Sequence, residues 1–227
     1  ILHLTSSKGL YRSTDAGANW TLIVPGATYH DIQYGHGTSG RTLYMSQDGG
    51  LLKSVDNGLN WGSVAPVGIS GKSEIGLTKA DTNYVFVFDE NGSAWESSDG
   101  GATWRTQNFP SFYDSQGAYN MALLVSPTDT NLILVGGVDG WRTTDGGATW
   151  HSYFNSFWTS GDPYFYLHSD HHTFELLPGS DSIAFTGHDG GLHRGNFTQG
   201  TVWQDLTPGL FVTHFYGLGA TDINPSI

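Results

Sequence analysis

The sequence predicts an all-β fold, a propeller of four-stranded antiparallel blades, on three observations. A turn that ends in tryptophan recurs along the 227 residues, and its copies at Trp20, Trp61, Trp104, Trp150 and Trp203 lie 41, 43, 46 and 53 residues apart. Repeats of this length indicate stacked supersecondary units. The chain has 32 Gly and 2 Met, a balance typical of many tight turns. No window shows the apolar 3.6-residue period of a long helix.

The order of elements within a repeat is constant, as the fourth copy illustrates. An apolar strand at 120–127 is followed by a polar turn and a second strand at 131–137. A Gly-containing turn leads to a third strand at 141–144, and a second turn ends at Trp150, where the fourth strand begins. Four short antiparallel strands per repeat describe a propeller blade. We therefore expect one domain over 1–227, with blades at about 29–66, 67–110, 111–158 and 159–211.

The two ends of the chain predict how the first blade is completed. When the repeats are aligned with one another, the last residue of the chain falls just before the repeat position of the first residue, with one position between them. Residues 212–227 would then supply the first strand of a blade whose other strands lie in 1–28, and this pairing would bury two edge strands. Two alternatives stay open: a closed ring of five blades, or five repeats that form part of a larger propeller. The sequence shows no address tag at its start, which favours the second.

The recurring phrase itself has a structural explanation. An aspartate that opens a turn can accept hydrogen bonds from amides further along the chain, and glycine adopts the left-handed backbone that such turns need. The tryptophan can bury a large apolar area while its N–H finds a carbonyl. We therefore expect structural roles for the aspartates and tryptophans of the four good copies: Asp15, Trp20, Asp56, Trp61, Asp99, Trp104, Asp145 and Trp150.

These four copies resemble the Asp-box, or BNR, repeat, usually written S-x-D-x-G-x-T-W. The resemblance covers nearly the whole chain, although the fifth copy, at Trp203, has lost its aspartate. The superfamily includes sialidases, xyloglucan-cleaving glycosidases, sortilin-type receptors and secreted bacterial surface proteins, and this chain is most similar to the last group. The resemblance implies that the boxes join the third and fourth strands of each blade, on the face away from the ligand.

Functional side chains are therefore expected on the opposite face, in the turns between second and third strands and in the links between blades. Two of these links are long and aromatic, and aromatic rings beside carboxylates suit a carbohydrate. The alternative is that the links extend the core. The candidate ligand-binding residues on this face are Tyr113, Asp114, Trp158, Asp162, Tyr164, Tyr166, His171, His188 and Asp189.

One histidine-rich segment, "LHSDHHTF", predicts a metal site. In a strand, alternate residues share a face, so His168, Asp170 and His172 would point the same way. Two imidazoles and a carboxylate could hold a divalent ion such as zinc or calcium. The alternative is a network of hydrogen bonds. Polar residues near the start of each first strand are also expected to ring the channel mouth: His30 or Asp31, Glu74, Asn120, His171 or His172, and His214.

Composition excludes several classes of function. The formal net charge is −12 with only nine Lys and Arg, which disfavours a nucleic-acid partner or an anionic membrane. The chain has no Cys and therefore no disulfide, thiolate metal site or cysteine nucleophile. No apolar run is long enough to be a transmembrane segment.

The function predicted from these features is a secreted or cell-surface propeller, a non-catalytic module for binding, adhesion or assembly. Its partner would be a glycan or a surface protein, and flanking domains or self-assembly are compatible with this role. The alternative is a glycoside hydrolase with two carboxylates on the links of the upper face, although the spacing nominates no catalytic pair. A sialidase is disfavoured because Arg12, Arg142 and Arg194 occupy equivalent positions beside the boxes and cannot converge on one site.

Overall fold

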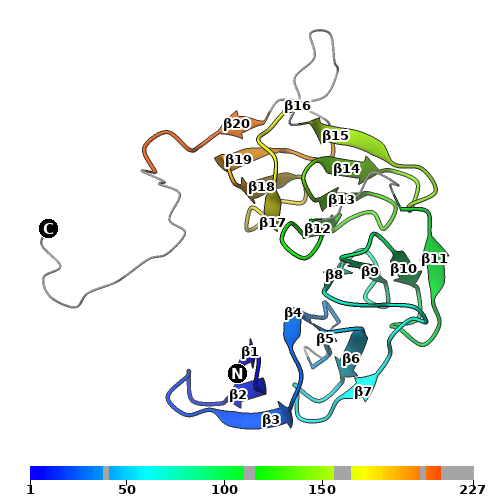
Figure 1. Cartoon of the computed structure of the whole chain (residues 1–227), viewed down its shortest axis with the longest axis vertical. Helices are drawn as coiled ribbons and strands as arrows, with labels where there is room; N and C mark the ends of the chain where they lie inside the picture. The colour runs from blue at the N-terminus through cyan, green and yellow to red at the C-terminus, as the bar shows by residue number, and fades with distance from the viewer. Residues whose placement is uncertain (38–40, 110–115, 156–164, 200–202, 211–227) are drawn as a thin grey trace, which may run out of the picture.

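The structure is a computed structural model that describes residues 1–37, 41–109, 116–155, 165–199 and 203–210. The described residues form twenty β-strands in five sheets, with no helix among them (Figure 1). The sheets stand side by side in an arc. The predicted all-β class is thus confirmed, and the predicted four-stranded antiparallel unit is confirmed in three of the five sheets. Within this part of the chain, no helix is long and apolar enough to cross a membrane.

Each sheet is one blade, numbered here in chain order. Blade I contains β1 (Leu2–Ser6), β2 (Gly9–Ser13) and β3 (Thr21–Pro25), and blade II contains β4 (Tyr29–Tyr34), β5 (Leu43–Gln47), β6 (Gly50–Ser54) and β7 (Gly62–Ser63). Blade III contains β8 (Ser73–Leu77), β9 (Val85–Asp89), β10 (Ala94–Ser97) and β11 (Arg105–Gln107). Blade IV contains β12 (Ala122–Val125), β13 (Ile133–Gly136), β14 (Gly140–Thr143), β15 (His151–Asn155) and β16 (Phe165–Tyr166). Blade V contains β17 (His171–Leu176), β18 (Ile183–His188), β19 (Gly191–Asn196) and β20 (Gln204–Asp205).

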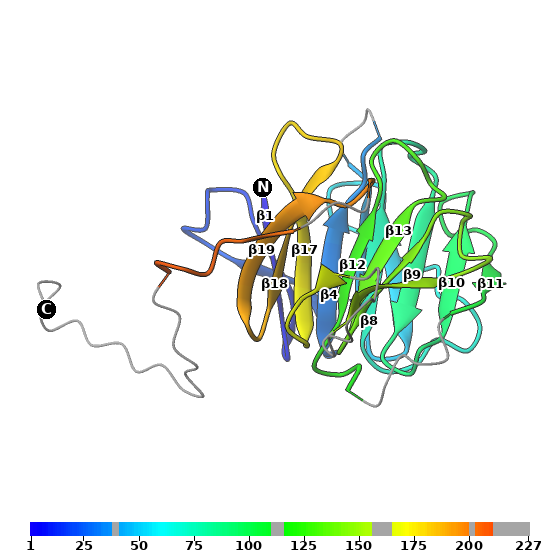
Figure 2. The same cartoon turned by 90° about the horizontal axis from the view of Figure 1, so that it is seen from above.

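The strands of a blade pair in chain order from the inside of the arc to the outside. The innermost strands β4, β8, β12 and β17 contact one another in sequence, while β1 contacts β4 (Figures 1 and 2). Blade IV differs from the expectation, because β16 adds a fifth strand parallel to β15. Within the described residues β1 pairs only with β2. Residues 212–227 lie outside the described residues, so their pairing with β1 stays a prediction.

The core is divided into layers between neighbouring blades, because the alternate side chains of each strand face opposite neighbours. Four buried clusters follow one another along the arc. Their largest buried members include Leu10 and Met45 between blades I and II, Tyr44 and Trp95 between II and III, Phe86 and Ile133 between III and IV, and Phe154 and Trp203 between IV and V. The sheets thus hold one another in place through apolar contact.

The Asp-box hairpins join the third and fourth strands, as the sequence indicated. In blade III the Asp99 carboxylate accepts hydrogen bonds from the Thr103 N–H at 2.8 Å and from the Thr103 hydroxyl at 2.6 Å. Gly101 follows with a left-handed φ of 89°. Blades I, II and IV repeat this arrangement, and in all four boxes the hydrogen bonds lower the aspartate pKa to about 2. The box aspartates therefore hold turns.

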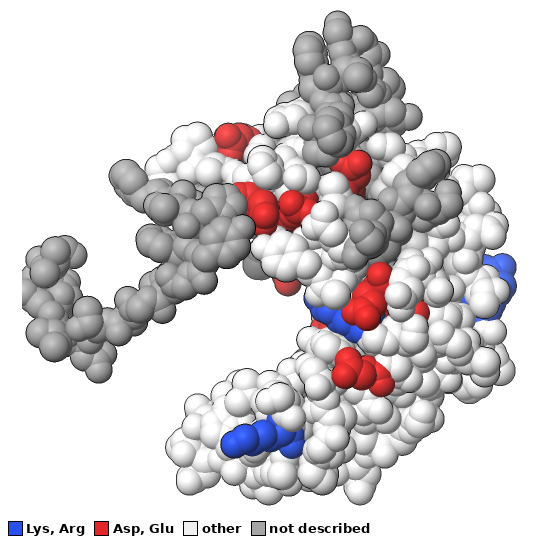
Figure 3. Space-filling view, in the orientation of Figure 1, with Lys and Arg blue, Asp and Glu red and all other residues white. Residues whose placement is uncertain are grey.

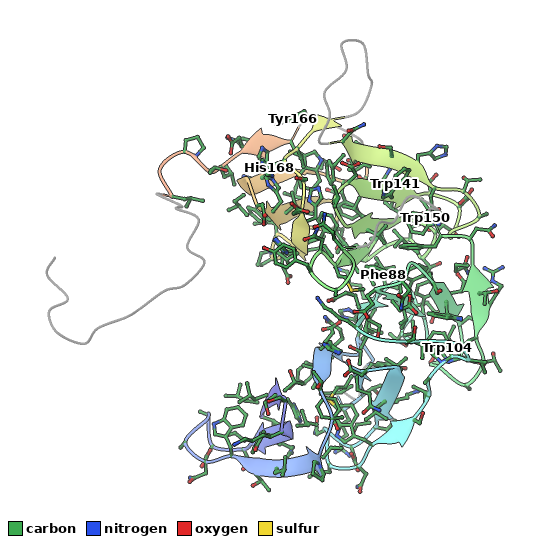
Figure 4. The ribbon with its side chains drawn as sticks, viewed as in Figure 1. Phe88, Trp104, Trp141, Trp150, Tyr166 and His168 are labelled. Atoms are coloured by element: carbon green, nitrogen blue, oxygen red, sulfur yellow. The ribbon has the colours of Figure 1, made fainter. Side chains whose placement is uncertain are left out.

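Two of the box tryptophans connect blades through hydrogen bonds, whereas the Trp61 indole N–H donates to the Gly58 carbonyl of its own hairpin at 3.0 Å. The Trp104 indole N–H donates to the Val64 carbonyl of the preceding blade at 2.7 Å, and that of Trp150 donates to the Asn108 carbonyl at 2.5 Å. Both rings lie toward the outer side of the arc (Figure 4). Trp20 differs: it is 39% exposed, because within the described residues no blade precedes blade I.

Candidate functional site

The two faces of the arc follow from the strand directions. The box hairpins and the turns between first and second strands form the lower face. The turns between second and third strands and the links between blades form the upper face, where the ligand is expected. Five of the candidate residues on that face, Tyr113, Asp114, Trp158, Asp162 and Tyr164, lie outside the described residues. Tyr166 is described, 57% exposed, and lies close to His168 on the link into blade V (Figure 4).

The best-defined feature of the upper face is an aromatic ring beside a histidine–carboxylate pair. The Tyr119 side chain is 60% exposed and meets the His172 ring edge-on, with the ring centroids 5.0 Å apart. His172 Nε2 lies 2.8 Å from Asp189 Oδ1. The pairing of β17 with β18 shifts register between His171 and Thr173, so His172 occupies a bulge and turns to the upper surface. We call Tyr119, His172 and Asp189 the tyrosine platform.

Asp170 fixes the surroundings of the tyrosine platform. It has a left-handed φ of 68°, rare outside glycine, Asn and Asp. Its N–H donates to the Val138 carbonyl at 3.1 Å, and its own carbonyl accepts the Asp189 N–H at 3.2 Å. Its carboxylate accepts a hydrogen bond from the Asn120 amide. Asp170 thereby joins a turn of blade IV, a turn of blade V and the link that carries Tyr119.

Two predicted ligand residues, His171 and His188, lie instead inside the layer between blades IV and V. His171 is 1% exposed, stacks on Phe154 with centroids 5.2 Å apart, and places Nδ1 3.0 Å from the Thr186 hydroxyl. His188 is 6% exposed. They are cross-strand partners on the face of blade V that packs on blade IV, so neither can offer its ring to a ligand on the upper surface.

Hydrogen bonds define the tautomer of the buried His188. His188 Nδ1 accepts the Gly190 N–H at 3.1 Å, so its proton lies on Nε2 and is donated to His193 Nδ1 at 2.9 Å. Burial, followed by the charges of neighbouring histidines, lowers the pKa of His171 to about 3 and that of His188 to about 4. The layer therefore contains neutral imidazoles at neutral pH.

The structure does not assemble the metal site predicted from His168, Asp170 and His172. β17 begins only at His171, and the left-handed backbone at Asp170 breaks the strand alternation on which the prediction depended. The three side chains bond elsewhere: His168 to the Ser169 carbonyl, Asp170 to Asn120, and His172 to Asp189. Among the described residues, no three His, Cys, Asp or Glu side chains are arranged to hold a metal ion. The hydrogen-bond network, the alternative interpretation of this segment, describes what is present.

A second histidine–carboxylate pair was not recognised from the sequence. His30 Nε2 lies 2.5 Å from Asp48 Oδ1 on blade II. The sequence contained a signal for this pair, because "YHDIQY" and "DHHTFE" each place a histidine ahead of a "DGG" turn. His30 lies 18 residues before Asp48, and His172 lies 17 residues before Asp189. The one-residue difference between these spacings concealed the equivalence of the two pairs.

Two carboxyl groups lie between these pairs, at the upper ends of β4 and β8. The Asp31 carboxylate accepts the Ile75 N–H at 3.0 Å and the Gln33 amide at 2.9 Å. Glu74 Oε1 is 3.7 Å from Lys72 Nζ. Burial raises the pKa of Asp31, and burial followed by the charge of Asp31 raises the pKa of Glu74 to about 8. The pair therefore retains a proton near neutral pH.

The centre of the arc is hollow. A cavity of about 360 Å³ lies among the inner strands and is lined by apolar side chains such as Leu123 and Leu176, with Gln33 and Lys79 among its polar residues. Acidic side chains gather around the notch on the inner side of the arc, with basic ones beside them (Figure 3). Of the predicted channel residues, His30, Asp31, Glu74, Asn120 and His172 lie at the upper ends of inner strands, and we call this region the upper mouth. His214 lies outside the described residues.

Comparison with known proteins supports the fold and leaves the site unassigned. The family described as DUF6242 beta propeller domain matches residues 2–195. The GH74 enzyme of Niastella koreensis superposes with a TM-score of 0.71 at 17% identity, over 90% of this chain and 35% of that one. The GH74 xyloglucanase of Xanthomonas campestris gives a TM-score of 0.58 at 18% identity, over 87% and 35%.

A structure of the mitotic checkpoint complex contains a chain that superposes with a TM-score of 0.63 at 9% identity, over 88% of this chain and 58% of that one. No curated protein matches the sequence. The chain spans about a third of the length of the two GH74 enzymes. At these identities the likeness to solved structures shows the fold alone, so the function must be argued from the site.

Proposed function

The chain belongs to the DUF6242 β-propeller family, and we propose that it is a non-catalytic binding module whose upper face holds a glycan. A secreted or cell-surface location is part of this proposal. Cell fractionation of the native host tests it, and recovery of the protein from the cytoplasm alone would refute it.

The tyrosine platform is the observation that carries the proposal. A sugar ring presents C–H groups on its faces and hydroxyls at its edge. The exposed Tyr119 ring offers an apolar surface on which the C–H groups of a sugar face can stack. His172 and Asp189, with Nε2 and Oδ1 held 2.8 Å apart, offer a hydrogen-bond donor and an acceptor for the sugar hydroxyls. Because Asp170 fixes the backbone around them, these groups are arranged before a ligand arrives, which reduces the entropy lost on binding.

The test is binding to neutral polysaccharides, measured by isothermal titration calorimetry and by retardation in gels that contain the polymer. Xyloglucan is the first probe, because one structurally similar enzyme is a xyloglucanase. We expect Tyr119→Ala to weaken binding about threefold to tenfold, the loss of one stacked ring. His172→Ala should weaken it to a similar extent.

Tyr34→Ala is a matched control. Tyr34 is also an exposed tyrosine beside a histidine, with its hydroxyl 2.6 Å from His3 Nδ1, but it lies on the lower face. Equal loss in both tyrosine variants would contradict a site on the upper face. If no neutral polysaccharide binds and a protein of the host surface is retained instead, the ligand class is wrong and the module binds protein.

A second candidate function, glycoside hydrolysis, is favoured by one specific observation. Asp31 and Glu74 together hold a proton at the upper mouth, and glycosidases use one protonated and one ionised carboxyl group. Release of reducing ends from xyloglucan by the wild type, abolished in Glu74→Gln, would support it. Absence of release under conditions in which the polymer binds would leave the binding module as the function.

A further inference from the structure

We infer that the ligand of the upper face is an uncharged glycan chain that crosses the upper mouth and is held at both sides by equivalent histidine–carboxylate pairs. The inference rests on the proposed function and deepens it, since it specifies a chain instead of a single sugar and excludes acidic polysaccharides.

The equivalence of the two pairs is a property of the backbone. In blade II the Asp48 N–H donates to the Thr28 carbonyl at 3.3 Å, and in blade V the Asp189 N–H donates to the Asp170 carbonyl at 3.2 Å. In each case the acceptor lies two residues before the paired histidine. Both inner strands also shift register at this point, between Tyr29 and Ile32 and between His171 and Thr173. The two blades thus present a histidine and an aspartate in the same way.

Blade III repeats the backbone geometry with different side chains. The Glu90 N–H donates to the Lys72 carbonyl at 2.8 Å, so Glu74 and Glu90 occupy the positions that histidine and aspartate occupy in blades II and V. The inner strand there has no register shift. Blades II and V lie on either side of blades III and IV, and β4 and β17 border the hollow of the arc (Figure 1). The two histidine–carboxylate pairs therefore face the same mouth from two sides.

Both pairs reach the surface. The Asp48 side chain is 63% exposed and that of its partner His30 is 17% exposed, while those of His172 and Asp189 are 35% and 26% exposed. The surface between them offers the hydrogen-bonding groups of Lys72 and Glu74 on blade III, whose side chains are partly exposed. A chain of sugars can satisfy such groups with its many hydroxyls, whereas an apolar ligand would leave them unpaired.

Charge narrows the class of glycan. Among the described residues, Asp48, Glu90 and Asp189 stand at the outer edge of the mouth. Within it, the Asp31–Glu74 pair retains one proton and so adds a single negative charge, beside the positive charge of Lys72. The net charge of the whole chain, −12, is also negative. A chain of uronic acids would be repelled, while an uncharged chain would not.

The experiment compares ligand length and charge. The probes are cello-oligosaccharides and xylogluco-oligosaccharides of increasing length, with polygalacturonate as the charged polymer, titrated into wild type, His30→Ala, Asp48→Asn and His172→Ala. We expect affinity to rise with length until the chain reaches both pairs. His30→Ala and Asp48→Asn should then weaken the longest probes roughly tenfold and leave the shortest unchanged. His172→Ala should weaken probes of every length, because the shortest bind at Tyr119. Polygalacturonate should not bind.

The outcomes separate this inference from the proposed function. If no uncharged probe of any length binds to the wild type, both fail. If the probes bind but affinity is independent of length, or His30→Ala and Asp48→Asn both bind the longest probe as the wild type does, the glycan site stands and the crossing chain is refuted. Binding of polygalacturonate at least as tight as that of the neutral polymers would refute the charge selection. Lys79→Ala, which breaks a lower-face contact with Asp181, is the control variant and should bind every probe normally.

Discussion

Acid should destabilise this propeller through His171, and the size of the effect can be worked from the structure. The His171 ring is 1% exposed between Thr186 and Phe154, and its pKa is lowered to about 3. In the unfolded chain a histidine titrates near pH 6.5. Because the folded pKa is the lower one, the unfolded state binds the extra proton between these values. The stability that the neutral ring provides is therefore complete above about pH 6.5 and is lost as the pH falls toward 3.

At pH 4.5 the loss from this residue amounts to about 2.7 kcal/mol, because this pH lies two units below the unfolded pKa and each unit is worth about 1.36 kcal/mol. This value changes little if the folded pKa is anywhere below 4. His188 acts in the same direction, since its pKa is lowered to about 4. A loss of this size is a large share of the stability of an ordinary domain.

The assay is urea unfolding followed by tryptophan fluorescence at pH 7.5, 6.5, 5.5 and 4.5, for the wild type and His171→Gln. The glutamine can keep the hydrogen bond to Thr186 but does not titrate. Between pH 6.5 and 4.5 the free energy of unfolding of the variant should fall less steeply, by about 1.2 kcal/mol per pH unit on average. His151→Gln, an exposed histidine on β15, controls for the substitution itself. Equal slopes for wild type and His171→Gln would refute the reasoning.

Three further predictions concern the scaffold. Gly136→Ala should lower the free energy of unfolding by about 1–3 kcal/mol, because the added Cβ would lie 2.6 Å from that of His171. If urea unfolding shows no loss of stability, the side chains between blades IV and V can move to accommodate the methyl group, and the prediction is wrong. Trp104→Phe should lower the free energy of unfolding by about 1 kcal/mol, since it removes the 2.7 Å hydrogen bond to Val64 while keeping an aromatic ring. A loss of stability larger than that of Trp104→Ala would contradict this assignment. Deletion of 211–227 should speed amide exchange in β1 if this segment supplies the missing strand of blade I; unchanged exchange rates in β1 would favour the alternative of a larger propeller.

Local chemistry explains why so much of the scaffold could be predicted from the sequence. The Asp99 box is closed by hydrogen bonds within seven residues, from Ser97 to Thr103, and its glycines supply the left-handed backbone that the turn requires. Interactions that lie this close along the chain leave a pattern in the sequence. The repeat of that pattern predicted the strand order, and its resemblance to the Asp-box implied the face on which the boxes lie.

The site was predicted less well, because its geometry depends on residues far apart in the chain. The strand alternation assumed for His168, Asp170 and His172 fails at one left-handed residue, Asp170, and nothing in the adjacent sequence requires that conformation. His171 was expected on the surface but faces blade IV, since which face of a strand is buried depends on the neighbouring sheet.

By itself, the sequence determined the repeat, the class of fold, the structural role of the box aspartates and the acidic character that disfavours nucleic acid. Only the tertiary structure decided that His30 and Asp48 form a pair, that Tyr119 on the link into blade IV meets His172 of blade V, and that burial and the charge of Asp31 raise the pKa of Glu74. The physical reason is one of range. A turn is held by bonds between near neighbours, whereas burial, pairing and charge coupling arise only when separate sheets are brought into contact.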